Sequence, residues 1–153
     1  MEIACQAALK RLACYVIIRE DHIWQEELEM ATGAKILVVD DNDVFLIVVS
    51  KMLSRLGYEV ASADSGENGL SIFLKNKFDI VLSDYEMPGM DGVALACSVK
   101  KSSPRTRVVI MTGAGREIVF SRNSTAVDEV ISKPFTLAQI DETILRQSVA
   151  CVS

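Results

Sequence analysis

The sequence predicts an α/β fold, a doubly wound parallel sheet of five strands with helices on both faces. Short apolar runs rich in β-branched residues, such as Ile36–Val39 and Arg107–Thr112, are typical of parallel strands buried on both faces. Five such strands alternate with helical patterns between Lys35 and about Arg146, and this alternation predicts a parallel sheet with right-handed crossovers. Several of the runs end on a polar residue, which is where open α/β sheets place their chemistry.

The first two strand–helix pairs cover residues 36–75. A strand at 36–39 ends in Asp40-Asp41, and Asn42 or Asp43 can cap the helix that follows. Gly57 is expected to end this helix as its C′ residue. A second strand is expected at 58–63, and Ser65 starts a second helix. The residues of this helix expected to face inward are Leu70, Ile72, Phe73 and Leu74.

The stretch from Phe78 to Gly92 reads as a buried strand that ends on Asp84. Pro88-Gly89 and Asp91-Gly92 then break regular structure, so the chain turns sharply just past this carboxylate. A helix follows, with its apolar positions at Val93, Leu95, Ala96 and Val99.

The last two strands are expected at residues 107–112 and 127–132. The first ends on Thr112 and leads through Gly113 toward a short helix at 117–120. The second is closed by Lys133-Pro134, and Thr136 caps a final helix. The apolar face of this helix is expected at Leu137, Ile140, Ile144 and Leu145.

Residues 34–147 are expected to form the domain, with an N-terminal leader or linker at 1–33 and a tail at 148–153. The leader is either helical or disordered. Cys5, Leu9, Leu12 and Val16 fall at helical spacing, whereas residues 15–18 could equally form a strand. A loosely packed leader and a dimerisation helix both remain open.

Composition excludes several classes of function. The net charge of −5 argues against a nucleic-acid surface. The four cysteines lie far apart without metal-binding spacing, which favours reduced thiols in a cytoplasmic protein. No apolar run is long enough to cross a membrane or organised as a signal peptide, so a membrane partner is not expected.

The polar strand ends are Asp40-Asp41, Asp84, Thr112 and Lys133, and in a doubly wound sheet they share one rim. Converging carboxylates repel and raise one another's pKa, so they remain ionised only beside a cation. Their hard oxygens favour Mg²⁺. With the Lys133 charge and the Thr112 hydroxyl, they would form a pocket for a phosphoryl group on Asp84. Taken singly, the aspartates could cap a helix, Thr112 could simply end a strand, and Lys133 could be solvated.

Four motifs resemble those of response regulator receiver domains, in order and in spacing. They are Val39-Asp40-Asp41, Ser83-Asp84-Tyr-Glu-Met-Pro-Gly-Met-Asp-Gly92, Met111-Thr112-Gly113 and Ser132-Lys133-Pro134-Phe135. The resemblance covers Lys35 to about Arg146 and implies the flavodoxin-like strand order 2-1-3-4-5 of CheY-like proteins. It also implies a cis peptide bond before Pro134.

The resemblance implies a role for each site residue. Asp84 is the nucleophile that takes a phosphoryl group from a phosphohistidine on a partner kinase. Mg²⁺ is bound by Asp41, Asp84 and the backbone carbonyl of Glu86, with Asp40 acting through a metal-bound water. Lys133 neutralises the charge on the transferring oxygens, and Thr112 and the Gly113 amide hold the phosphoryl oxygens. Glu86 and Ala114 line the route of the water that later hydrolyses the acyl phosphate.

One position departs from the family pattern. Receivers commonly carry Tyr or Phe three residues before the lysine, where this chain has Val130. A valine cannot exchange a ring between buried and exposed positions. The signal is therefore expected to travel through the Gly113–Gly115 loop and the helix after it.

The leading hypothesis is a phosphoacceptor receiver, either stand-alone or excised from a hybrid kinase. The residues after Arg146 are too few for an output domain, so it would act by docking to partners. The expected partners are a histidine kinase or phosphotransfer protein and a downstream effector, and a homodimer could form through the fifth strand and last helix or through the leader.

The protein is not expected to be an enzyme beyond self-phosphorylation and slow autodephosphorylation. The competing hypotheses are an aspartyl phosphatase, which would want a second Asp as acid/base where Glu86 stands, and a binding module that no longer takes phosphate.

Overall fold

The computed structural model describes residues 33–113 and 125–149. Within them the chain forms five strands and four helices, which alternate as far as β4. The elements are β1 (Lys35–Val39), α3 (Asp43–Arg55), β2 (Glu59–Ala63), α4 (Gly66–Lys75), β3 (Ile80–Asp84), α5 (Gly92–Ser102), β4 (Arg107–Thr112), β5 (Glu129–Ser132) and α7 (Leu137–Val149). Residues 1–32 of the leader expected at 1–33, Ala114, the short helix expected at 117–120 and residues 150–153 lie outside the described part.

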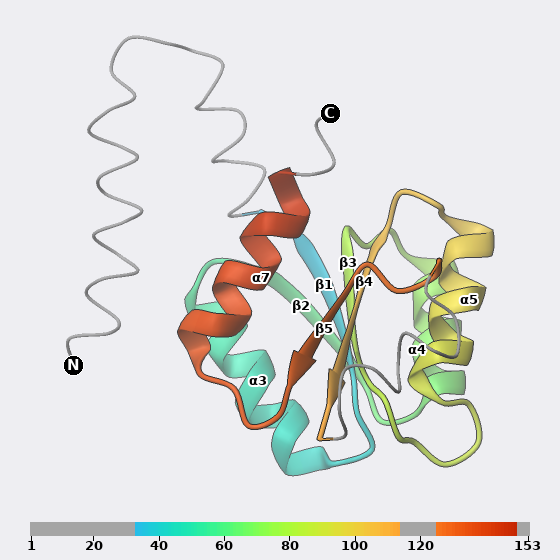
Figure 1. Ribbon diagram of the computed structural model, residues 1–153, viewed down its shortest axis with the longest axis horizontal. Helices are drawn as coiled ribbons and strands as arrows, with labels where there is room; N and C mark the ends of the chain where they lie inside the picture. The colour runs from blue at the N-terminus through green and yellow to red at the C-terminus, as the bar shows by residue number, and fades with distance from the viewer. Residues whose placement is uncertain (1–32, 114–124, 150–153) are drawn as a thin grey trace, which may run out of the picture.

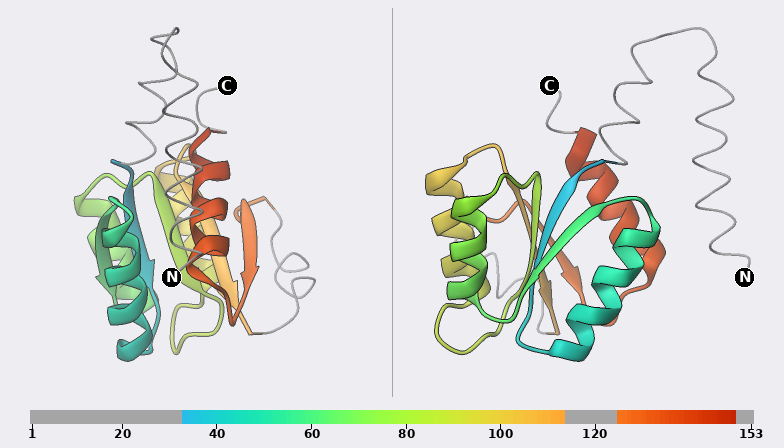
Figure 2. Two further views of the ribbon diagram at one scale, coloured as in Figure 1. Left: turned by 90° about the vertical axis from the view of Figure 1, so that its left-hand side faces the viewer. Right: turned by 180° about the vertical axis from the view of Figure 1, so that it is seen from behind.

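The strands form one parallel sheet in the order β2-β1-β3-β4-β5. This confirms the predicted doubly wound fold and its strand order. Helices α3 and α7 cover one face of the sheet, and α4 and α5 cover the other (Figures 1 and 2). All strands run the same way, so their carboxyl ends meet at one edge.

Strand β1 buries side chains on both faces, because successive residues point to opposite sides of the sheet. Leu37 and Val39 of β1 pack in the cluster that includes residues of α4 and α5. Ile36 and Val38 pack in the cluster that includes α3 and α7. All four are fully buried. The continuous apolar run of β1 is thus explained, since neither face meets water.

Local signals set the helix ends. The Asn42 side chain accepts a hydrogen bond from the amide of Phe45 and caps α3, and Ser65 caps α4 through the amide of Asn68. Gly57 follows α3 with φ of +93°, a conformation that glycine adopts without steric cost. Before α7, the Thr136 hydroxyl accepts from the Gln139 amide, and the Gln139 side chain accepts from the Thr136 amide. These reciprocal bonds form a capping box.

One expected core residue is misplaced. Leu74 is 62% exposed, although it was expected to face inward. Phe73 points into the core, and adjacent residues on a helix differ by about 100° in direction. Ile72 and Leu74 therefore flank Phe73 on opposite sides, and the buried stripe is too narrow to cover both.

Two strands begin later than expected, at Glu59 and Glu129. Tyr58 precedes β2 but is buried, and its hydroxyl donates to Asp141 of α7 over 2.7 Å. Val127 is likewise buried outside the regular strand. Tyr58 and Val127 have the apolar character of buried strand residues, and this explains why both strands were expected to start earlier.

Within the described residues, no helix has both the length and the apolar character that crossing a bilayer requires.

Candidate functional site

The parallel register brings the polar strand ends to one edge of the sheet. Val39 pairs with Ser83, and Asp84 pairs with Met111, so Asp40 and Asp84 emerge from neighbouring strands. Thr112 pairs with Ser132, and the Lys133 amide donates to the Thr112 carbonyl over 2.7 Å. The predicted shared rim is present.

Lys133 joins two of the aspartates directly. Its Nζ lies 2.6 Å from Oδ2 of Asp40 and 2.7 Å from Oδ1 of Asp84. The Asp40 side chain is 2% exposed and that of Asp84 is 12% exposed. Two carboxylates against one ammonium leave an excess negative charge in a place that is largely shielded from water.

The remaining oxygens of both carboxylates are also held. The Asn42 amide donates to Oδ1 of Asp40 over 2.9 Å. The Glu86 amide donates to Oδ2 of Asp84 over 3.1 Å. In both cases the backbone amide two residues after the aspartate orients the carboxylate.

Burial and charge shift the pKa values in this group. Burial raises the pKa of Asp84, the Asp40 charge adds to this, and together they outweigh the hydrogen bonds from Lys133 and the Glu86 amide. Burial lowers the pKa of Lys133, but the hydrogen bonds and charges of Asp40 and Asp84 raise it above its ordinary value. The surroundings of Asp84 therefore disfavour its ionised form, whereas those of Lys133 favour its cationic form.

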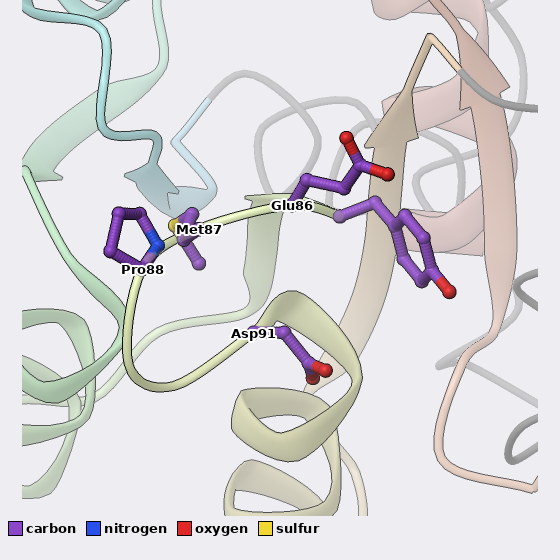
Figure 3. Close-up of a pocket in the computed structure, with 5 residues that line it drawn as sticks. Glu86, Met87, Pro88 and Asp91 are labelled. Atoms are coloured by element: carbon purple, nitrogen blue, oxygen red, sulfur yellow. The ribbon is translucent and has the colours of Figure 1, made fainter.

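The loop after Asp84 borders a pocket of about 410 Å³ beside the site (Figure 3). It is lined by Tyr85, Glu86, Met87, Pro88 and Asp91. In Figure 3 the Glu86 carboxylate extends from one side of the loop and Asp91 stands at the start of α5 on the other. The pocket is open to solvent, and its lining begins at Tyr85, the residue directly after Asp84.

Two contacts hold this loop in place. A Cβ on Gly92 would lie 2.1 Å from the carbonyl oxygen of Asp84, so only glycine lets α5 start this close to the strand. The Met90 amide donates to Oε1 of Glu67 at the start of α4 over 2.9 Å. The sequence reasoning missed Glu67, because no local pattern links α4 to a loop more than twenty residues away.

The other predicted site residues are placed as follows. Thr112 is buried at the end of β4, and Gly113 beside it is exposed. Asp41 is exposed and is not part of the hydrogen-bonded group around Lys133. The Lys133–Pro134 peptide bond is cis, as the resemblance implied.

The fit of the site to a metal ion rests on its donor chemistry. Within residues 33–113 and 125–149, no three His, Cys, Asp or Glu side chains are gathered closely enough to hold a metal by themselves. The excess negative charge on hard carboxylate oxygens nevertheless suits Mg²⁺, which usually binds through one or two carboxylates and keeps several waters. The residues present fit that mode of binding.

The protein-family model of the response regulator receiver domain matches residues 36–145. The autoinducer 1 sensor kinase/phosphatase LuxN of Vibrio harveyi is 33% identical over 67% of this chain, but the match covers only 12% of LuxN. The probable chemotaxis protein CheY of Rhizobium etli is 31% identical over 76% of this chain and 94% of that protein. The chain thus spans nearly all of one relative and a small part of the other.

Solved structures agree with the sequence relatives. A receiver domain protein from Clostridium thermocellum is 32% identical with a TM-score of 0.72, over 76% of this chain and 95% of that chain. The response regulator TrrA of Thermotoga maritima, solved in complex with Mg²⁺-BeF, is 28% identical with a TM-score of 0.67, over 74% and 98%. With its parallel sheet, its rim of carboxylates and this match, the chain belongs to the response regulator receiver domain family, the phosphoacceptor modules of two-component signalling.

Proposed function

We propose that Asp84 is the phosphoacceptor and that it takes its phosphoryl group from a phosphohistidine on a histidine kinase or phosphotransfer protein. The observation that supports this most directly is the buried group of Asp40, Asp84 and Lys133, in which one ammonium contacts both carboxylates. A structural ion pair needs only one carboxylate. The second leaves a negative charge that a phosphate-handling site uses to attract a cation.

The reaction is a displacement at phosphorus. A carboxylate oxygen of Asp84 forms the new bond, while the phosphorus–nitrogen bond breaks and its electron pair stays on the histidine nitrogen. The carboxylate needs no general base, because it reacts in its ionised form, which the contact with Lys133 favours. Lys133 neutralises charge on the transferring oxygens, and Thr112 and the Gly113 amide hold them after transfer.

The proposed metal ligands are Asp40, Asp41, Asp84 and the backbone carbonyl of Glu86. A Mg²⁺ ion held there supplies charge neutralisation to the phosphoryl oxygens. The TrrA structure, solved in complex with Mg²⁺-BeF, supports binding of Mg²⁺, and the donor chemistry of the rim supports these residues as its ligands. Asp41 is exposed next to Asp40, within the same loop.

The phosphorylated state is proposed to decay by slow hydrolysis without turnover of any external substrate. Glu86 is exposed beside the site, which is consistent with access of water to the acyl phosphate. The chain is proposed to act in the cytoplasm by docking to a downstream effector, with homodimerisation through β5 and α7 as one form of output.

The outer face of α3 supports docking of the phosphodonor. Val44, Ile47 and Val48 are 71%, 55% and 44% exposed on the first half of this helix, which begins directly after Asp40 and Asp41. Exposed apolar side chains gathered on one helix face mark an interaction surface more often than an ordinary surface. A partner seated there would lie on the helix that follows Asp40, whose carboxylate shares Lys133 with Asp84.

Labelling by acetyl phosphate tests the proposal. The wild-type chain is expected to become phosphorylated only with Mg²⁺, and Asp84→Asn abolishes the label. Asp79→Asn is the control, because Asp79 lies just before β3 and its carboxylate accepts from the Lys35 amide at the opposite edge of the sheet.

Each competing function predicts a different result. Turnover of small phosphate esters without a stable phosphoprotein would favour a phosphatase. An absence of label in correctly folded wild-type protein would favour a binding module and contradict the proposal.

A further inference from the structure

A phenylalanine on α3 contacts the lysine of the site. Nζ of Lys133 lies 4.1 Å from the centroid of the Phe45 ring. The same ring meets Phe135 edge-to-face, with 5.9 Å between the centroids and 81° between the planes. Phe45 is held in turn by its own amide, which donates to the Asn42 side chain that caps α3.

The contacts of Lys133 show what this ring does. Two sides of the ammonium are occupied by Asp40 and Asp84, and the Phe45 ring lies against it as a third neighbour. A long lysine side chain samples many rotamers unless its surroundings restrict it. The ring attracts the cation through its quadrupole and takes up the space into which the side chain would otherwise swing.

We propose that Phe45 is a positioning residue that holds the Lys133 ammonium between Asp40 and Asp84, where it meets the incoming phosphoryl oxygens. This inference rests on the proposed function of Asp84. Phe45 does not touch the reacting atoms and acts only through Lys133. Its place on α3 also connects the orientation of Lys133 to the helix whose outer face is exposed for docking.

Replacing the ring tests the proposal in the unphosphorylated, magnesium-free protein. The Lys133 methylene protons beside Nζ are expected to show a ring-current shift in the wild type, which Phe45→Leu abolishes and Phe45→Tyr retains. A nuclear Overhauser effect between the Phe45 ring and these protons is expected in the wild type. This measurement needs no variant, so it remains decisive if Phe45→Leu does not fold.

The rate of phosphorylation by acetyl phosphate is the second measurement. Phe45→Leu is expected to lower it about 3- to 10-fold, the range between an exposed and a desolvated cation–aromatic contact. Phe45→Tyr is expected to keep it within about twofold, since the ring is retained. Phe78→Leu is the matched control, because Phe78 is also half-buried and stacks on Phe73 in the other core cluster.

The possible results are distinct. Unchanged Lys133 resonances in Phe45→Leu, or a loss of rate no larger than that of Phe78→Leu, would overturn the positioning role. If wild-type protein is not labelled at all, the proposed function fails, while the Lys133 resonances still decide whether Phe45 orients the lysine.

Discussion

Asp84 carries its negative charge in a place where burial opposes it. Lys133 contacts Asp84 but also contacts Asp40, so the single ammonium is shared. The pKa of Asp84 stays raised because burial and the Asp40 charge outweigh this shared partner. At the scale of the residue, the site is therefore prepared for a further cation at some cost in stability.

This cost predicts a pH-dependent effect of Asp84→Asn. The pKa of Asp84 in the folded protein lies above the ordinary value of 3.8. Protonated Asp84 therefore contributes stability that is fully present below pH 3.8 and is lost as the pH rises through the folded-state pKa. At pH 7 without Mg²⁺, Asp84→Asn is expected to raise the free energy of unfolding by about 1 kcal/mol, within the range common for single stabilising substitutions.

Urea denaturation of wild type and variant at pH 7 and pH 4 checks this prediction. The gain is expected to shrink as pH falls toward 4, where the wild-type carboxyl is increasingly protonated. Asp91→Asn is the control, since Asp91 caps α5 through the Ala94 amide and asparagine caps a helix equally well. A gain that is the same at both pH values would show that the charge of Asp84 is not its source.

A second prediction at the scale of the residue concerns the stability cost of replacing Gly92. An alanine Cβ would lie 2.1 Å from the Asp84 carbonyl oxygen and 3.1 Å from Cδ1 of Ile110. Gly92→Ala is expected to cost about 1–3 kcal/mol of stability, the usual effect of overpacking. Gly113→Ala is the control, because a Cβ added there would have no neighbouring atom within 4 Å. Equal midpoints for Gly92→Ala and wild type in urea would show that α5 can retreat without cost.

At the scale of the element, helix α3 presents apolar side chains on two faces. Leu46, Val49 and Leu53 bury its inner face against the sheet. The outer face carries Val44, Ile47, Val48 and Met52, which are exposed. A helix that only covers a sheet normally presents polar side chains to water. The apolar outer face therefore supports the proposed docking of a phosphodonor on α3.

Ile47→Ser tests this role. Transfer from a phosphohistidine donor protein that labels the wild type is expected to fall several-fold. Labelling by acetyl phosphate is expected to change little, and the free energy of unfolding is expected to change by no more than about 0.5 kcal/mol. Leu74→Ser is the matched control, because Leu74 is similarly exposed and apolar but lies on α4, across the sheet. Equal transfer rates for the two variants would argue against docking on α3.

On the scale of the whole molecule, the site is connected to both helical layers. Phe45 and Phe135 link Lys133 to the cluster under α3 and α7, and Gly92 links Asp84 to α5. Val130 lies in the opposite cluster and is 1% exposed. A buried valine without a ring to move offers no two-position switch on β5.

The beryllofluoride complex tests how the signal leaves the site. Amide shifts are expected to be largest at Thr112, Gly113 and the residues after them, and small on β5 and α7. The measurement compares amide resonances with and without beryllofluoride and Mg²⁺. A rearrangement of residues 127–131 and α7 as strong as that of the site would contradict the predicted path.

The sequence by itself determined the class of fold, the starts of α3, α4 and α7 to within a residue or two, and the residues of the rim. These follow from local rules, since burial on both faces of a parallel strand, capping side chains and a carboxylate at a strand end are all visible within a few residues. Asp40, Asp84, Thr112 and Lys133 could therefore be named from the chain alone. The roles of these residues came from the family resemblance, and they remain to be tested by experiment.

Only the tertiary structure decided which of these residues touch. It placed Lys133 between Asp40 and Asp84, left Asp41 exposed, and brought Phe45 and Glu67 to the lysine and to the loop after β3. It also turned Leu74 outward and left the outer face of α3 uncovered. These features depend on distances between segments far apart in the chain, which the packing of helices on the sheet sets and no local pattern encodes.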